Sequence, residues 1–308
     1  MTSVIFPGQG SQFLNMTRDF FDNFSDVRDI FSEIEDSTKI DLKKIIFGSD
    51  PKLINTTNYT QISIFAASIA IYKTLEANFG FGSKNNKVNY MLGHSLGEYS
   101  ALAASKSITI AQASKLLQKR GNLMNSAVEP NSTSMAALIG MNCNQIENII
   151  KKYNLEIEIA NDNSPGQVVV SGANIEIINS EKIFISQGVK KFVKLNVSAA
   201  FHSKFMIDSQ NKLNHEIDKV NFLDPISKII SNYDASVNSK AINVVKNLKL
   251  QMANRVRWTE SILTLEKHEE RKVIEIGPGK VLSGLIKRIT KTFDIISINN
   301  IDDLEKIK

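Results

Sequence analysis

Cysteine and long apolar runs are the two features that this 308-residue chain has least of. Its single cysteine, Cys143, has no partner for an internal disulfide, and no group of Cys and His residues has the spacing of a zinc site. No apolar run approaches the roughly 18 residues that span a bilayer. The N-terminus shows neither a charged region nor a cleavable signal pattern. We therefore expect a protein of the reducing cytoplasm, without a membrane anchor, a metal or a signal peptide.

The charge of the chain is positive but not patterned. Its 37 Lys and Arg residues outnumber its 32 Asp and Glu residues, which gives a net charge of +5 and a pI near 9.0. The basic residues are spread along the chain and are not interleaved with aromatic residues, so nucleic acid is not an expected partner. A solvated lysine surface, an acidic protein partner and a phosphate-rich substrate are all compatible with this charge.

Short apolar runs that end at glycine-rich turns predict the architecture. Residues 4–6 are followed by Pro-Gly-Gln-Gly, residues 88–92 by Gly93, and residues 273–276 by Gly-Pro-Gly and an apolar stretch over 281–289. Each segment is typical of a strand, a turn and a helix. Repeated units of this kind predict a mostly parallel sheet covered by helices, an α/β fold like the core of an α/β-hydrolase.

The order of the predicted strands and helices changes between residues 132 and 198. This stretch predicts a strand, a helix, two strands, a helix and a strand, at 135–139, 145–153, 156–160, 167–171, 175–187 and 191–197. The order βαββαβ is that of the ferredoxin-like fold. We therefore expect a ferredoxin-like subdomain over 131–198, inserted into an α/β-hydrolase-like core made of 1–130 and 199–308. The charged end of the chain is expected to fray.

Gly-His-Ser-Leu-Gly at 93–97 places a serine between an apolar run and a helix-compatible stretch. A serine hydroxyl is a poor nucleophile at neutral pH, so an enzyme that uses one must expose it, place a base beside it and stabilise the oxyanion. The two glycines allow a sharp strand-to-helix turn that projects Ser95, and Leu96 supplies the next backbone N–H. A glycine-rich helix start is the alternative interpretation, but the flanking strand and helix favour a nucleophile.

His202 is the histidine that we expect to act as the base. Of the four histidines, His94 adjoins the serine and points elsewhere, while His215 and His268 lie in polar helical segments typical of a solvated face. His202 lies where the chain re-enters the core after the inserted subdomain, and such a joint is a usual place for a cleft. A partly buried histidine satisfied by the backbone is the alternative, which a serine in need of a base disfavours.

Six motifs, in a fixed order, carry a family resemblance. They are Pro-Gly-Gln-Gly-Ser-Gln at 7–12, Gly-His-Ser-Leu-Gly-Glu-Tyr-Ser-Ala-Leu at 93–102, Gln-Lys-Arg-Gly at 118–121, Asn-Ser-Pro-Gly-Gln at 163–167, Phe-His-Ser at 201–203 and Glu-Ile-Gly-Pro-Gly-Lys at 275–280. Together they resemble the malonyl-CoA:acyl carrier protein transacylases of fatty-acid synthesis over nearly the whole chain. The resemblance implies a ping-pong transfer in which a serine takes malonyl from coenzyme A and passes it to the phosphopantetheine thiol of an acyl carrier protein.

The resemblance also implies roles for individual residues. Ser95 would be the acylated nucleophile and His202 its general base, oriented by the main-chain carbonyl of Gln251 in place of an aspartate. The backbone N–H groups of Gln9 and Leu96 would form the oxyanion hole, since the glycines that flank Gln9 let its backbone approach a ligand closely. An acidic carrier protein would account for the positive charge of the chain.

Arg120 matches the arginine that, in this family, holds the free carboxylate of the malonyl group. A carboxylate in a partly dry cleft needs a charged partner, and a guanidinium binds it through two parallel hydrogen bonds. Without the motif, Arg120 would be read as a charge on a helix surface. Met124, one turn later, would line the same pocket or belong to the core. Leu96 and Phe201 resemble the malonyl-selecting version of the motifs, in which Phe201 fills the space of an α-methyl branch, a preference worth about 1–3 kcal/mol.

Two residues depart from the family pattern. Asn15 stands where glycine is usual, and asparagine is the next residue to tolerate a left-handed backbone. Arg255 stands where proline commonly precedes Val-x-Trp, so the loop near Gln251 is not expected to follow the family geometry in every detail. Neither departure falls on the nucleophile, the base or the carboxylate-binding arginine.

The implied reaction needs no metal or cofactor, since the coenzyme A thioester is the substrate, and we expect a monomer. A serine hydrolase or thioesterase on a similar scaffold, in which water takes the acyl group, is the alternative enzyme, and Arg120 discriminates between the two. A carrier-protein-binding module without chemistry is the alternative outside the enzymes.

Overall fold

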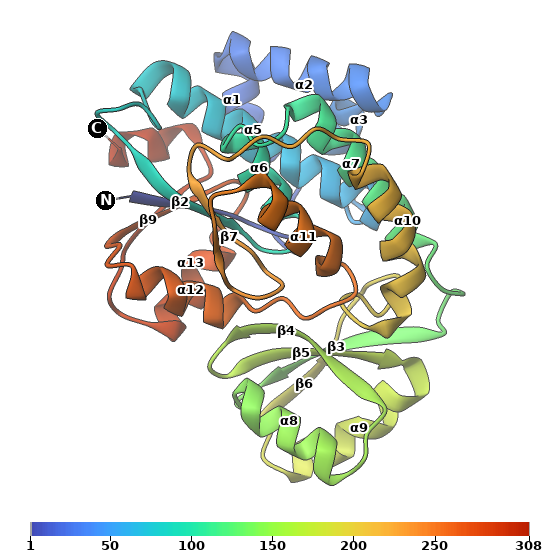
Figure 1. Cartoon of the computed structure of the whole chain (residues 1–308). Helices are drawn as coiled ribbons and strands as arrows, with labels where there is room; N and C mark the ends of the chain where they lie inside the picture. Colours follow the sequence, from blue (N-terminus) through green and yellow to red (C-terminus); the bar gives the residue numbers. More distant parts are fainter. Residues whose placement is uncertain (1, 308) are drawn as a thin grey trace.

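The computed structural model describes residues 2–307, and the larger of its two sheets has six strands in the order β10-β9-β1-β2-β7-β8 (Figure 1). Neighbouring strands from β10 to β7 run parallel, and β8 pairs antiparallel with β7 at one edge. The mostly parallel sheet predicted from the sequence is confirmed. Its strands are β1 (Thr2–Phe6), β2 (Val88–Gly93), β7 (Lys228–Ile230), β8 (Val237–Asn238), β9 (Lys272–Ile276) and β10 (Asp294–Ile298).

Helices cover both faces of this sheet because its central strands are apolar on both sides. In β1, Val4 and Phe6 pack into the cluster on one face and Ile5 into the cluster on the other, and all three are fully buried. The helices of this core are α1 (Arg18–Asn23), α2 (Ser25–Thr38), α3 (Leu42–Phe47), α4 (Pro51–Ile54), α5 (Thr57–Phe79), α6 (Gly97–Ala104), α7 (Ile110–Asn125), α10 (Ile207–Ile217), α11 (Ala241–Gln251), α12 (Trp258–Lys267) and α13 (Val281–Ile289). The group around α5 covers the first face, and α12 and α13 cover the second (Figure 1).

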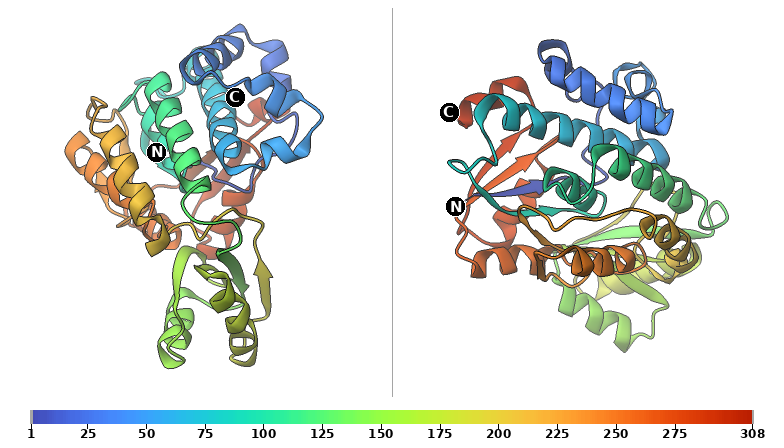
Figure 2. Two further views of the ribbon diagram at one scale, coloured as in Figure 1. Left: turned by 90° about the vertical axis from the view of Figure 1, so that its right-hand side faces the viewer. Right: turned by 45° about the horizontal axis from the view of Figure 1, so that its top comes forward.

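A second, four-stranded sheet belongs to a smaller body that projects from the core (Figure 2). Its strand order is β4-β5-β3-β6, and every neighbouring pair is antiparallel. The chain order βαββαβ confirms the predicted ferredoxin-like pattern. The elements are β3 (Thr133–Ile139), α8 (Cys143–Lys152), β4 (Ile157–Ser164), β5 (Gln167–Ala173), α9 (Asn174–Ser186) and β6 (Lys191–Lys194).

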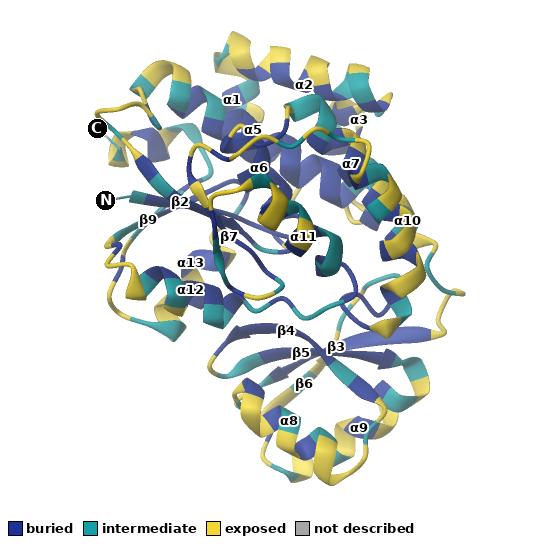
Figure 3. Cartoon of the chain, viewed as in Figure 1, coloured by how far each residue is buried: buried dark blue, intermediate teal, exposed yellow. Residues whose placement is uncertain are grey.

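The small sheet lies between its own helices and the core. Leu138 and Val170 face α8 and α9, while Met135 and Val169 on the opposite face join the cluster of the core. Figure 3 shows mostly buried residues along β3, β4 and β5 and, below them in that view, two helices whose outer surfaces are exposed. Because successive side chains of β3 and β5 point to opposite faces of the sheet, one face packs against the core and the other against α8 and α9. The domain boundaries proposed from the sequence, 131–198 within 1–130 and 199–308, stay a prediction.

Three local features of the structure test more detailed predictions from the sequence. Asn15 has φ 63°, which confirms the left-handed backbone expected for an asparagine in place of glycine. β6 ends at Lys194, not at residue 197, because the residues that follow, Leu195 and Val197, pack against the cluster of the core. The expected fraying of the C-terminal end is wrong for residues 302–307, since Ile301–Lys306 forms the 3₁₀ helix η2 and buries Leu304; residue 308 lies outside the described residues.

Among the helices of residues 2–307, none combines the length and the apolar character that a membrane crossing requires.

Candidate active site

Ser95 lies in the turn between β2 and α6, at the carboxyl end of a central strand of the large sheet. Its backbone is left-handed, with φ 52°, a conformation that costs a non-glycine residue about 1–3 kcal/mol. A Cβ on Gly93 would lie 1.8 Å from the carbonyl carbon of Gly97, and one on Gly97 would lie 2.3 Å from the Phe6 carbonyl oxygen. Both glycines are therefore required by the tightness of this turn, residues 93–97, which we call the Ser95 turn.

His202 lies beside the serine, on the segment that returns from the small body. Its Nε2 is 2.9 Å from Ser95 Oγ, and its Nδ1 is 3.1 Å from the main-chain carbonyl oxygens of both Gln251 and Asn254. Because carbonyl oxygens only accept, Nδ1 carries the proton and Nε2 is free to accept the hydroxyl proton. Burial, and then the charge of Arg120, lower the pKa of His202 to about 3, so its imidazole is neutral at pH 7.

Arg120, on α7, is 1% exposed and reaches the serine from another side. Its Nη1 donates to Gln61 Oε1 at 2.7 Å, and its Nη2 donates to Ser95 Oγ at 2.9 Å and to Gln251 Oε1 at 3.1 Å. All three acceptors are neutral, Nε has no partner among the described residues, and burial lowers the pKa of the guanidinium. The charge of Glu98 acts to raise that pKa, but Glu98 makes no hydrogen bond to Arg120. A buried cation whose hydrogen-bond acceptors are all neutral is unfavourable, so this geometry favours an anionic ligand.

Two backbone N–H groups border the serine without an acceptor among residues 2–307: those of Gln9 and Leu96. Gln9 lies in the turn after β1, which packs against the Ser95 turn. A Cβ on Gly8 would lie only 2.5 Å from the His94 carbonyl oxygen, so this close approach requires glycine. Backbone donors that are fixed in place and left unpaired can stabilise an oxyanion.

These groups meet at a cavity of about 100 Å³ beside the serine. Its wall contains seven of the eight residues predicted from the sequence, namely Gln9, Ser95, Leu96, Arg120, Met124, Phe201 and His202. The eighth, Gln251, lies behind them and contacts His202 through its carbonyl and Arg120 through its side chain. The remaining wall residues are His94, Met135, Asn161, Leu195 and Val197.

The other three histidines are not placed to act on the serine. His94 borders the cavity, but its Nε2 lies 2.8 Å from Asn163 Oδ1 and its ring packs 5.6 Å from that of Trp258. His215 and His268 are exposed.

Sequence reasoning missed several residues that hold this arrangement. Asn232 Oδ1 accepts from the Ser95 N–H at 2.7 Å, and Glu98 Oε2 accepts from Gln251 Nε2 at 2.7 Å. Burial raises the pKa of Glu98 to about 7. An acidic residue in the otherwise uncharged helix after the Ser95 turn was a usable signal for Glu98. Asn232 and Gln61 carried none, because they lie 137 and 59 residues from their partners.

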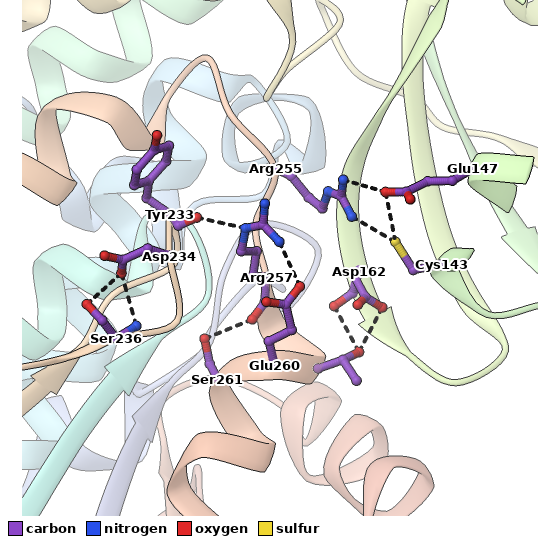
Figure 4. Close-up of polar contacts among 11 residues, drawn as sticks. Cys143, Glu147, Asp162, Tyr233, Asp234, Ser236, Arg255, Arg257, Glu260 and Ser261 are labelled. Carbon is purple, nitrogen blue, oxygen red and sulfur yellow. Dashed lines mark hydrogen bonds and ion pairs between the residues drawn. The ribbon is translucent and has the colours of Figure 1, made fainter. Parts of the chain in front are cut away.

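Arg255, which departs from the family pattern, lies on the loop between α11 and α12 and extends toward the small body (Figure 4). Its Nη1 donates to Cys143 Sγ at 2.9 Å and its Nη2 to Glu147 Oε1 at 2.6 Å, both on α8. Arg257 on the same loop pairs with Glu260 at 2.8 Å. The loop keeps the two main-chain carbonyls on the histidine, so the departure does not disturb its orientation.

The chain matches a family model described as an acyl transferase domain over residues 4–303. It is 32% identical over 306 residues to a malonyl CoA-acyl carrier protein transacylase of Bacillus subtilis (strain 168), covering 98% of this chain and 95% of that protein. It is 31% identical over 308 residues to the protein of the same name from Haemophilus influenzae, covering 99% of this chain and 97% of that protein.

Solved structures show the same similarity. The crystal structure of an acyl carrier protein S-malonyltransferase from Vibrio cholerae matches with a TM-score of 0.94 and 32% identity, over 100% of this chain and 99% of that one. A malonyl-transacylase in complex with a type II PKS acyl-carrier protein matches with a TM-score of 0.94 and 32% identity, over 99% of this chain and 98% of that one. The chain belongs to the acyl transferase family, among the malonyl CoA-acyl carrier protein transacylases.

Proposed function

We propose that this chain transfers a malonyl group from malonyl-CoA to the phosphopantetheine thiol of an acyl carrier protein, through a malonyl ester of Ser95, in the cytoplasm. One observation carries the choice of acyl group. The buried guanidinium of Arg120 has only neutral acceptors and lies 2.9 Å from Ser95 Oγ. An acyl group with its own carboxylate would pair with Arg120 while its thioester carbonyl lies at the serine.

The first half of the reaction forms the malonyl ester. The thioester oxygen lies at the N–H groups of Gln9 and Leu96, and His202 Nε2 takes the hydroxyl proton as Ser95 Oγ attacks the carbonyl carbon. The two N–H groups hold the oxyanion that forms. The carbon–sulfur bond then breaks, and His202 returns the proton to the departing coenzyme A sulfur.

The second half runs the same steps with another thiol. The carrier-protein thiol gives its proton to His202, and its sulfur attacks the ester carbonyl at the same pair of N–H groups. When the ester bond breaks, His202 returns the proton to Ser95 Oγ. Both halves start from a neutral imidazole, which agrees with the pKa of about 3 for His202. Since the thioester already activates the acyl group, neither half calls for a redox cofactor.

The apolar wall of the cavity supports a preference for a short acyl group. Met124 and Phe201 are 2% and 5% exposed, and with Leu96 they leave only about 100 Å³ beside the serine. A branch on the α-carbon of the acyl group would press against this wall, and discrimination by one methyl group is worth about 1–3 kcal/mol.

The test is to incubate the protein with malonyl-CoA and to measure its intact mass. Wild type should gain one malonyl group, and Ser95→Ala should gain none. Ser100→Ala is the matched control, because Ser100 is a fully buried serine on α6 whose hydroxyl has no partner among the described residues. It should be labelled like wild type. A label that persists in Ser95→Ala would contradict the proposal.

A further inference from the structure

We propose that Asn232 is a positioning residue for the nucleophile, whose side-chain amide holds the strained Ser95 turn in its reactive conformation and reserves the Leu96 N–H for the oxyanion. The inference rests on the proposed function of Ser95. Asn232 itself lies outside the cavity wall and outside every sequence motif described above.

The amide of Asn232 spans the two sides of the turn. Its Oδ1 accepts from the Ser95 N–H at 2.7 Å, and its Nδ2 donates to the Gly93 carbonyl oxygen at 2.7 Å. Only one orientation of the amide fits, because exchanging its oxygen and nitrogen would set donor against donor and acceptor against acceptor. Asn232 is 1% exposed, so water does not replace these bonds when they are lost.

The backbone of Asn232 is fixed as well. Asn232 follows β7, which pairs with β2, and its N–H donates to Glu98 Oε2 at 3.2 Å. Its carbonyl oxygen accepts from the Arg257 N–H at 3.0 Å. Since Glu98 lies in the first turn of α6, Asn232 ties the sheet, the Ser95 turn and this helix together.

This anchoring has a chemical consequence at the Ser95 turn. A residue with φ 52° relaxes unless neighbouring groups hold it. Asn232 occupies the Ser95 N–H, and the Ser95 carbonyl accepts from Gln251 Nε2 at 3.0 Å. The peptide between Ser95 and Leu96 is thereby held, and in a trans peptide the Leu96 N–H points away from that carbonyl. Loss of the Asn232 amide would let both Oγ and this N–H shift, and a shift of about 1 Å can slow a reaction by about 100-fold.

The test measures the nucleophile without assuming an acyl group. A small fluorophosphonate reacts with an activated serine: Ser95 Oγ attacks phosphorus, fluoride leaves and His202 takes the hydroxyl proton. Its rate of attachment to Ser95 is followed by mass spectrometry. We expect Asn232→Ala to react about 10- to 100-fold more slowly than wild type. With acyl-CoA substrates, kcat should fall by a similar factor for malonyl and acetyl groups while KM changes little.

Asn238→Ala is the matched control, because Asn238 is a buried asparagine 5% exposed, whose amide bonds to Ser231 and Ser236 in the same segment and not to the Ser95 turn. It should react within about twofold of wild type. Asn232→Asp fills the same volume without the Nδ2 donor and should also be slow, which decides the question if Asn232→Ala fails to fold. Folded Asn232 variants that react at the wild-type rate would overturn the proposal. A wild type that reacts with the fluorophosphonate but not with malonyl-CoA would instead overturn the proposed function alone.

Discussion

Replacement of Arg120 by alanine separates the binding of a carboxylate from the chemistry at the serine. Arg120 makes three hydrogen bonds, to Gln61, Ser95 and Gln251, and its guanidinium is buried. In the proposed complex it also pairs with the malonyl carboxylate. Removing one partner of a buried, hydrogen-bonded charge pair costs about 2–5 kcal/mol. Since each 1.4 kcal/mol is about a factor of ten, kcat/KM for malonyl-CoA should fall by about 30-fold to several thousand-fold.

Acetyl-CoA has no carboxylate, so Arg120→Ala removes only the hydrogen bonds of Arg120 with Gln61, Ser95 and Gln251, and of these only the bond to Ser95 Oγ involves a reacting atom. We expect a fall of about tenfold or less, in line with the net value of about 0.5–1.5 kcal/mol for an ordinary hydrogen bond. Lys119→Ala is the control, because Lys119 is exposed, adjoins Arg120 on α7 and carries the same charge. It should change both rates by less than twofold. Steady-state kinetics with both thioesters make the measurement, and an equal loss for malonyl and acetyl in folded Arg120→Ala would refute the assignment.

Three further predictions concern stability and selectivity. The fold lowers the pKa of His202 from 6.5 to about 3. Below pH 6.5 the unfolded chain therefore binds a proton at this residue that the folded chain does not, and the free energy of unfolding falls as the pH is lowered. Between pH 7 and 5 the free energy of unfolding in urea should fall by about 2 kcal/mol more for wild type than for His202→Gln; parallel curves would contradict the pKa. Gly93→Ala places a Cβ 1.8 Å from the Gly97 carbonyl carbon and should lower the thermal midpoint of unfolding. Gly284→Ala in α13, where a Cβ meets nothing within 4 Å, should raise the free energy of unfolding by about 0.5–1 kcal/mol, and with it the midpoint. Equal midpoints for the two would refute the tightness of the Ser95 turn. Phe201→Ser should raise the kcat/KM of methylmalonyl-CoA relative to malonyl-CoA by about 5- to 150-fold, and an unchanged ratio would exclude Phe201 as the selecting side chain.

The sequence predicts those parts of the fold that depend on local pattern. The apolar runs of β2 and β9 and the helix Val281–Ile289 follow directly from their periodicity and from the glycines that end the strands. The alternation in β3 and β5 also gives the small sheet. By contrast, the end of β6 and the η2 helix depend on contacts with distant parts of the chain, which periodicity does not record.

The candidate site divides in the same way. Ser95 is recognisable because the glycines that its turn requires are its sequence neighbours. Asn232 and Gln61 are not, because their roles come from side chains that meet across the fold. The main-chain carbonyl of Asn254, the second acceptor for His202 Nδ1, could not be predicted for another reason. Every residue type has a main-chain carbonyl, so the sequence does not indicate which one accepts this bond.

The fate of the malonyl ester on Ser95 tests the central claim most directly. The labelled protein is separated from coenzyme A, and loss of the label is timed in buffer alone, with a phosphopantetheine-bearing acyl carrier protein, and with the same carrier protein lacking that group. A transferase should keep the label in buffer and with the bare carrier, and lose it to the complete carrier, which gains one malonyl group. Rapid loss in buffer, with free malonate as the product, would contradict the account and identify a hydrolase.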